Sequence, residues 1–109
     1  MEDFSFIFDP EAKIIKCKFH GRMDTIRSNE AMAAFKEEYD GLLSSGVSEK
    51  ELKITFDLSG VDYISSSFLR LCISSTRGIE QANFSITNTD PEIMKVFKIA
   101  GLDGMLNVS

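Results

Sequence analysis

Apolar and polar residues alternate along the first part of the chain, and this alternation constrains the fold more than any other feature. Phenylalanine occupies every second position from 4 to 8, and a second alternating run extends from Lys13 to His20. A two-residue period is typical of β-strands. The turn-forming residues 9–12 separate the two runs, so the sequence predicts an antiparallel hairpin.

A long helix is predicted after Gly21, which we expect to break the second strand. Asp24 or Thr25 can cap the first turn of this helix, and Ser28 is a rival cap. The residues 44–46, Ser-Ser-Gly, are expected to end it. The expected buried face follows the 3.6-residue helical period and consists of Met32, Phe35, Tyr39, Leu42 and Leu43.

The second half of the chain alternates strands with helices. We predict strands over 53–58, which we expect to be central, and 83–87, a turn at 59–60, and helices over about 67–81 and 90–100. The last helix has the clearest signals, because Asp, Pro and Glu open it and a glycine follows its end. The expected inner faces comprise Leu69, Cys72, Ile73, Thr76 and Ile79 in the first helix and Ile93, Val96, Phe97 and Ala100 in the second.

The predicted order is β-β-α-β-α-β-α, and residues 102–108 are a candidate for one more strand. A hairpin followed by strand–helix alternation predicts the α/β class, with a mixed sheet flanked by about three to four helices. The 109 residues, 43% of them hydrophobic and 27% charged, are expected to form a single domain over 1–109.

The charge balance limits the classes of partner. The net charge is −5, with 17 acidic and 12 basic residues and no cluster of lysine or arginine. Nucleic-acid binding requires a basic surface, so we expect none. No apolar run approaches the roughly 20 residues of a membrane span, and the first residues are acidic where a signal peptide is basic. We therefore expect a cytoplasmic protein without membrane insertion, whose acidic balance permits a basic protein partner.

The two cysteines do not form a metal-binding pattern. Cys17 and Cys72 belong to no C-x-x-C pair, and His20 is the single histidine. These ligands are too few and too widely spaced for zinc, so we predict neither a metal nor another cofactor. Both cysteines are expected to be small buried residues in a reducing compartment.

Catalysis has little support in the sequence. Asp57 and Asp62 lie near the end of a predicted central strand, where sites of open α/β sheets tend to lie. We interpret Asp57 as a strand-end hydrogen-bond acceptor and Asp62 as a turn residue. A catalytic triad would have to use His20, and no nucleophile elbow or phosphate-binding glycine loop is present. We predict that the chain is not an enzyme.

Three serines, residues 65–67, stand at a predicted strand-to-helix junction. A helix N-terminus carries about half a positive charge and free N–H donors, so a phosphate there would find donors in place. Phosphorylation adds about −1.5 to −2 charges and would change a docking surface. One serine is therefore a candidate switch, and plain N-capping is the simpler interpretation.

Three segments resemble the STAS family. Residues 57–69 read DLSGVDYISSSFL and resemble the signature D-L-S-x-V-x-x-[IM]-D-S-[ST]-G-L. Residues 21–24 read GRMD and are similar to the family's G-x-[LM]-D. Residues 88–103 resemble its closing N-x-x-P-x-[IV]-x-x-[VL]-[FL]-x-x-[AT]-G-L-D. The three motifs occur in the family's order and span most of the chain.

The resemblance implies a mixed sheet with flanking helices and a role as an anti-sigma-factor antagonist. Such a module binds an anti-sigma factor that is also a serine kinase, is released when that kinase phosphorylates it, and is reset by a phosphatase. By position the acceptor is Ser66, with Ser67 and Ser65 as alternatives. The implied partner-binding residues are Asp24, Asp62, Ser65, Ser66, Ser67, Phe68 and Arg70.

The chain departs from the signature at two positions, and two hypotheses follow. Ser65 stands where the family has Asp, and Phe68 stands where it has Gly, which lets a backbone approach closely. In the first hypothesis Ser66 is still the acceptor and Phe68 belongs to an adapted interface. In the second the chain is a divergent, unphosphorylated STAS subunit of a transporter-associated or sensory complex. A third, enzymatic, hypothesis requires a pocket that joins His20 to Asp57 or Asp62.

Overall fold

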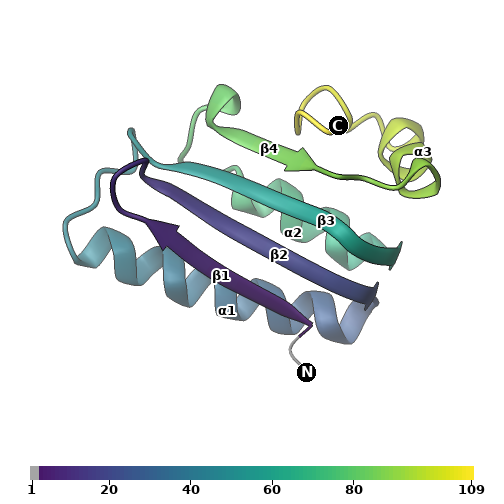
Figure 1. Ribbon diagram of the computed structural model, residues 1–109, viewed down its shortest axis with the longest axis horizontal. Helices are drawn as coiled ribbons and strands as arrows, with labels where there is room; N and C mark the ends of the chain where they lie inside the picture. Colours follow the sequence, from purple (N-terminus) through teal and green to yellow (C-terminus); the bar gives the residue numbers. More distant parts are fainter. Residues whose placement is uncertain (1–2) are drawn as a thin grey trace.

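The computed structural model describes residues 3–109, and its elements follow the predicted order (Figure 1). The first four elements are strand β1, strand β2, helix α1 and strand β3. The last four are helix α2, the short 3-10 turn η1, strand β4 and helix α3. Their bounds are Phe4–Asp9, Ile14–Met23, Thr25–Ser44, Lys53–Ile64, Ser66–Ser75, Gln81–Asn83, Phe84–Thr87 and Pro91–Ile99. The predicted α/β class, with a mixed sheet and flanking helices, is confirmed.

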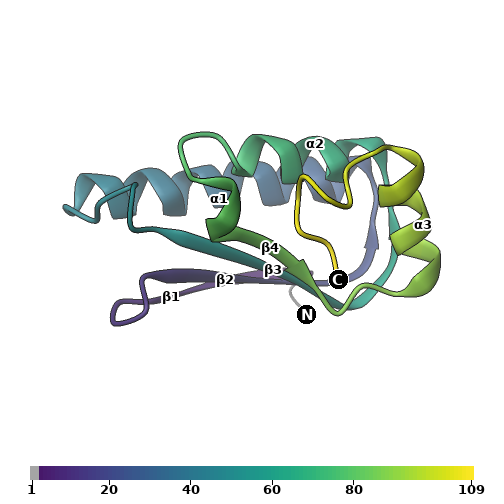
Figure 2. The same cartoon turned by 90° about the horizontal axis from the view of Figure 1, so that it is seen from above.

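The four strands form one sheet in the order β1-β2-β3-β4. β1 pairs antiparallel with β2, as the predicted hairpin requires, and Asp9 holds the turn by accepting hydrogen bonds from the backbone N–H groups of Glu11 and Ala12. β2, β3 and β4 are parallel. Helices α1 and α2 both lie on one face of the sheet, and α3 closes the end near β3 and β4 (Figure 2).

Aromatic rings fill the space between the sheet and the helices. Phe19 of β2 is fully buried, and its ring centroid lies 4.9 Å from that of Phe56 and 5.2 Å from that of Phe68. Both pairs meet edge to face, an arrangement that adds to the stabilisation from burial. Burying one such ring stabilises the fold by about 1.5–3 kcal/mol. The phenylalanines thus join the middle strands to α2.

β2 and β3 continue past the residues predicted to end them. Gly21 was expected to break β2, and Ser59-Gly60 was expected to turn the chain, but β2 reaches Met23 and β3 reaches Ile64. The ladder between them has two register irregularities, and Gly21 sits at one of them with φ +71°. A β-bulge kinks a strand without ending it, and glycine tolerates the left-handed backbone that such a site uses. Asp62 therefore lies in a strand and not in a turn.

α2 is shorter than predicted and is rotated about its axis. It ends at Ser75 and buries Ser67, Phe68, Leu71, Cys72 and Ser75, whereas Ile73 of the predicted stripe is exposed. The hydroxyl groups of Ser75 and Thr76 donate to the carbonyls of Leu71 and Ile73. Such bonds weaken a helix interior, and Gly78 with φ +83° follows. The tail forms a single bridge between Ile86 and Val108 and no full strand in the described residues.

Candidate functional site

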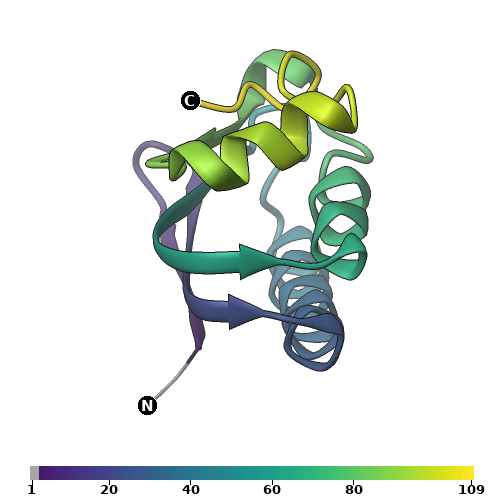
Figure 3. The same cartoon turned by 90° about the vertical axis from the view of Figure 1, so that its right-hand side faces the viewer.

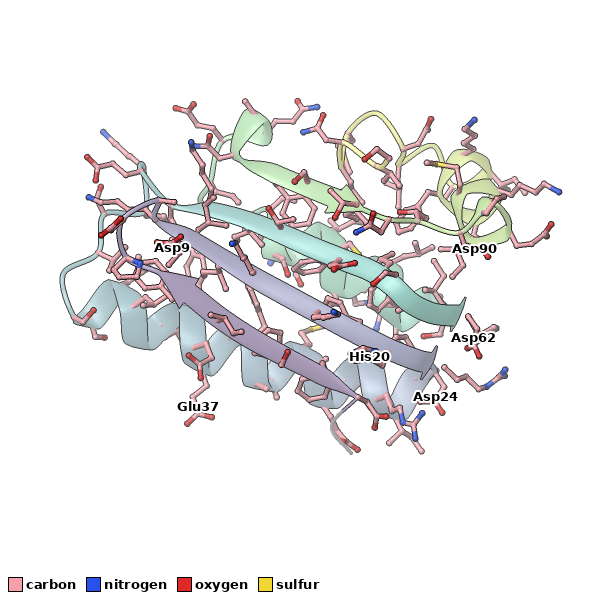
Figure 4. All side chains as sticks on the ribbon, in the orientation of Figure 1. Asp9, His20, Asp24, Glu37, Asp62 and Asp90 are labelled. Carbon is pink, nitrogen blue, oxygen red and sulfur yellow. The ribbon has the colours of Figure 1, made fainter. Side chains whose placement is uncertain are left out.

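The candidate site lies at the end of the sheet where β2 and β3 lead into α1 and α2. The two strands are parallel, so both helices begin at the same edge. Figure 3 shows this end of the molecule with the strands curving towards the helices, and Figure 4 shows Asp24 and Asp62 there. The side chains that the signature placed near the junction are therefore gathered at one end.

Each helix is capped by the side chain that immediately precedes it. Asp24 Oδ1 accepts a hydrogen bond of 2.9 Å from the backbone N–H of Arg27, and Ser65 Oγ accepts one of 3.3 Å from Phe68. Of the three residues that the sequence offered as caps of α1, Asp24 is therefore the one that caps the helix. The rival Ser28 is buried instead, and its hydroxyl donates to the carbonyl of Met23.

A buried hydrogen-bond cluster joins the two helix starts. Ser65 donates its backbone N–H to the carbonyl of Met23 over 3.0 Å, and Ser28 Oγ donates to the same carbonyl over 3.2 Å. The two hydroxyl oxygens lie 3.4 Å apart. Buried polar groups that satisfy one another hold one arrangement of their elements. The first turns of α1 and α2 are thus fixed relative to each other.

The three serines have different surroundings. Ser65 and Ser67 expose only 8% and 5% of their surface, whereas Ser66, the first residue of α2, is exposed. No side-chain hydrogen bond within residues 3–109 involves the Ser66 hydroxyl. Of the three candidates, Ser66 is therefore the one that an external protein can reach.

Phe68 does not lie on the surface. Its ring is fully buried against Phe19, because the rotation of α2 turns this position towards the sheet. The expectation that Phe68 contributes to an interface is wrong for its side chain. The ring takes part in the core directly beneath the first turn of α2.

Three exposed residues near the site were missed by the sequence analysis. The guanidinium group of Arg22 lies 3.9 Å above the ring of Tyr63, which is 39% exposed. Ile26, in the first turn of α1, is 70% exposed. Asp62 and Arg70 are exposed as well. Arg22 and Tyr63 are neighbours because the β2–β3 register is shifted, and the sequence contains no signal of that shift. Ile26 was recognisable from the sequence as an apolar residue outside the buried stripe of the helix.

Asp57 is remote from this junction and lies on the other face of the sheet. Burial disfavours its charge, but hydrogen bonds from the Ser59 backbone and the Asn88 side chain, with the nearby Lys18, outweigh burial and lower the pKa of Asp57. The hollow that contains Asp57 includes neither His20 nor Asp62. Of the three residues that the enzymatic hypothesis names, this hollow therefore contains Asp57 alone.

Within residues 3–109, no three His, Cys, Asp or Glu side chains are grouped in a way that could hold a metal ion. No helix of this part is both long and apolar enough to cross a membrane. Cys17 and Cys72 are buried free thiols, as predicted.

The fold and the serine-capped junction define a small mixed-sheet α/β module. A family model described as the Mlab, STAS domain matches residues 25–107, which is more than half of the chain. The chain therefore belongs to the STAS domain family. Comparison with curated protein sequences finds no match.

Solved structures share the fold at low sequence identity. An anti-sigma-factor antagonist (STAS) domain protein from Planctomyces limnophilus has a TM-score of 0.76 and 18% identity, covering 100% of this chain and 90% of that chain. Unphosphorylated SpoIIAA, an anti-sigma factor antagonist, has a TM-score of 0.63 and 17% identity, covering 88% of this chain and 82% of that chain. The phosphorylated form of the Bacillus cell fate determinant SpoIIAA has a TM-score of 0.63 and 17% identity, with coverages of 97% and 90%. The chain thus has an anti-sigma-factor-antagonist-like fold.

Proposed function

We propose that this chain is a cytoplasmic regulatory module that acts by binding a protein and not by catalysis. It binds a kinase-type anti-sigma factor at the junction of α1 and α2 and loses that partner when Ser66 is phosphorylated. A phosphatase restores binding. The observation that carries the proposal is the exposure of Ser66 at the first position of α2, between a capping serine and a buried one.

The surface around Ser66 has the composition of a protein interface. The exposed residues at this end of the sheet include the apolar Ile26 and the aromatic Tyr63, and also the charged Asp62 and Arg70. Interfaces are enriched in tyrosine and arginine, and large exposed apolar side chains often mark them. The Arg22 group stacked on Tyr63 restrains the ring before a partner arrives, which lowers the entropy lost on binding.

Phosphate on Ser66 would alter docking without opposing the fold. It would add about −1.5 to −2 charges beside a helix N-terminus, which favours negative charge. A partner surface packed closely against the uncharged Ser66 hydroxyl group would instead meet a bulky, doubly charged group for which it has no matching charge. We therefore expect phosphorylation to affect binding much more than stability.

The two departures from the family signature leave this arrangement in place. Ser65 caps α2 with its hydroxyl group, a role that serine and aspartate fill about equally well. Phe68 lies in the core and does not cover Ser66. Neither substitution removes the exposed hydroxyl group on which the switch depends.

The first experiment is intact-protein mass spectrometry with site mapping, on protein purified from its native cells under phosphatase inhibition. The expected result is a single phosphate on Ser66. The binding test compares wild type with Ser66→Asp against a kinase-fold partner isolated with the Ser66→Ala protein. The Ser66→Asp protein is expected to bind at least about tenfold more weakly, a loss of about 1.4 kcal/mol.

A matched control places the same change far from the junction. Ser48 is an exposed serine after the end of α1, about 30 Å along the helix from its first turn. Ser48→Asp is expected to bind like wild type. A Ser66→Asp protein that binds its partner as tightly as wild type would exclude the phosphorylation switch.

The absence of a carboxylate at position 65 favours a second candidate function. In this alternative the chain is an unphosphorylated STAS subunit of a transporter-associated or sensory complex, and the junction is a permanent interface. It predicts unmodified Ser66 and recovery of a transport ATPase in place of a kinase.

A further inference from the structure

The face of the sheet opposite α1 and α2 is a separate surface with its own chemistry. We call it the open sheet face and define it by Ile7 of β1, by Ile14, Lys16 and Lys18 of β2, and by Thr55 and Thr87 of β3 and β4. Together with Ser5 and Asp57, these residues line a shallow hollow of about 300 Å³. We propose that the open sheet face binds an acidic, amphipathic segment of a protein partner, independently of the Ser66 junction.

The topology leaves this face without a cover. Sheets with parallel strands are usually covered on both faces, and β2, β3 and β4 are parallel. Figures 2 and 3 show α1 and α2 on one side of the sheet and no helix of the described chain on the other. The exposed side of a parallel sheet is therefore a surface on which a partner element can take the place of the missing layer.

The open sheet face also exposes apolar surface. Ile7 is 65% exposed, and its neighbour in register is Lys16. Ile14 is half-buried on the same side of β2, two residues before Lys16. Single exposed apolar residues are common on protein surfaces, but Ile7 and Ile14 line the same hollow. They offer an apolar contact at one side of the hollow.

Two lysines and one carboxylate, that of Asp57, line this hollow, so its charge is positive although the whole chain carries −5. Lys16 and Lys18 point outward from the same side of β2. Neither forms an ion pair with a carboxylate of residues 3–109. Lys18 pairs in register with Asp57, whose carboxylate already accepts hydrogen bonds from Ser59 and Asn88. Lys16 pairs in register with Thr55 and is thus available for a partner carboxylate, while Lys18 has only Asp57 nearby, with which it forms no ion pair.

The combination of two isoleucines with two lysines selects the class of occupant. An amphipathic helix about 10 Å across covers roughly two strand spacings, so it can contact Ile7 and Ile14 while its glutamates reach Lys16 and Lys18. Single-stranded nucleic acid would need aromatic stacking platforms and a basic protein, and the residues that line this hollow include no aromatic ring. An acidic amphipathic helix satisfies both features of the face.

The test uses a synthetic helical peptide of about 15 residues with a leucine stripe flanked by glutamates. Its titration into isotope-labelled protein is followed by the backbone amide signals. The expected result is a set of shifts confined to β1, β2, Thr55 and Thr87, with an affinity that falls as salt is added. Lys16→Glu combined with Lys18→Glu is expected to weaken binding at least about tenfold.

The matched control makes the same charge change on another element. Lys95 and Lys98 are exposed on α3, and Lys95→Glu combined with Lys98→Glu is expected to leave the peptide affinity unchanged. Circular dichroism and thermal melts check that each variant is folded. The milder pair Lys16→Gln and Lys18→Gln provides a second test should the charge reversal disturb the sheet.

Four results would overturn the proposal. The first is the absence of any amide shift with peptide at millimolar concentration. The second is equal binding by the Lys16/Lys18 variant, or by a peptide with lysine in place of glutamate. The third is inorganic phosphate producing the same shifts with the same lysine dependence, which would indicate a small-anion site. The fourth is self-association through this face in sedimentation experiments. The Ser66→Asp protein is expected to bind the peptide with the same affinity as wild type. Failure of the Ser66 switch and failure of peptide binding at the open sheet face can therefore be told apart.

Discussion

Ser65 shows how one hydroxyl group defines where a helix begins. It satisfies the Phe68 backbone N–H, and its oxygen lies next to that of Ser28 in the buried cluster. Its neighbour Ser66 has the same side chain and faces solvent. Two identical residues in sequence thus have different roles, one in folding and one available for modification.

The first prediction compares these neighbours. Ser65→Ala removes the cap of α2 and leaves Ser28 with one partner fewer, so we expect the free energy of unfolding to fall by about 1–2 kcal/mol. Ser66→Ala removes an exposed group and should change it by less than about 0.5 kcal/mol. Urea denaturation of both variants measures the difference. Equal effects would show that Ser65 does not act as the cap.

The second prediction concerns the pH dependence of Asp57. Its pKa is lowered in the folded protein, so its ionised form contributes stability above the ordinary carboxyl pKa of about 3.9. That contribution is lost as pH falls through the lower, folded value. Asp57→Asn should therefore be less stable than wild type at neutral pH, and the gap should shrink below about pH 4. Denaturation curves at neutral pH and below about pH 4 measure the difference in the free energy of unfolding between the two proteins. A difference that is larger in acid would contradict the lowered pKa of Asp57.

At the scale of the element, β2 and β3 are shaped by their irregular pairing. Gly60 pairs in register with His20, and the histidine ring occupies the space where a side chain at position 60 would begin. An added Cβ atom would lie 2.5 Å from His20 Nδ1. The glycine thus allows two strands to remain paired beyond a bulge.

The third prediction tests this contact with a double-mutant cycle. Gly60→Ala should destabilise the protein by about 1–3 kcal/mol, because the ring must move from its position. The same change in a His20→Ala background should cost clearly less, which gives a non-additive pair. Thermal or chemical denaturation of the four proteins measures the coupling. If the effects of the two substitutions on the free energy of unfolding are additive, the destabilisation by Gly60→Ala arises from the backbone at position 60 and not from the contact with the His20 ring.

The elements were predictable where local signals agree with one another. The hairpin, α1 and α3 follow from alternation, capping residues and terminal glycines, and all three are confirmed. The predicted strand ends at Gly21 and Gly60 are wrong because a glycine in a bulge has the same sequence signal as a glycine in a turn. α2 was misplaced because serines and threonines at its end obscure both its length and its buried stripe.

At the scale of the whole molecule, the two cysteines report on the integrity of the core. Cys17 lies in β2 and Cys72 in α2, on opposite sides of the layer between sheet and helices, and both are buried. Burial raises the pKa of each thiol, so neither is expected to react in the folded state.

The fourth prediction follows from this protection. In native buffer both thiols should react with a thiol reagent slowly and at similar rates, limited by global unfolding. Denaturant should accelerate the two reactions in parallel. Mass spectrometry of modified peptides over time measures each rate. Fast modification of one cysteine alone would show that the element carrying it opens locally, without global unfolding.

The candidate site was only partly predictable from sequence. The resemblance named both Asp24 and Ser66 as site residues, and in the structure both lie at the same end of the sheet. Phe68 was misassigned because the rotation of α2 depends on how the whole helix packs. The Arg22–Tyr63 pair depends on a register shift between distant strands, and no local pattern encodes such a shift.

The parallel pairing of β2 with β3 also determines the order in which the molecule can form. The β1–β2 hairpin joins residues close in the chain, so it can close early and at little entropic cost. Ile14 meets Lys53, and Met23 meets Ile64, only after the whole of α1 has crossed back over the sheet. Contacts between residues so far apart slow the search for the native state. We therefore expect the closure of this crossover to limit the folding rate, and a nascent chain on the ribosome to remain without its central ladder until residues beyond Ile64 have emerged.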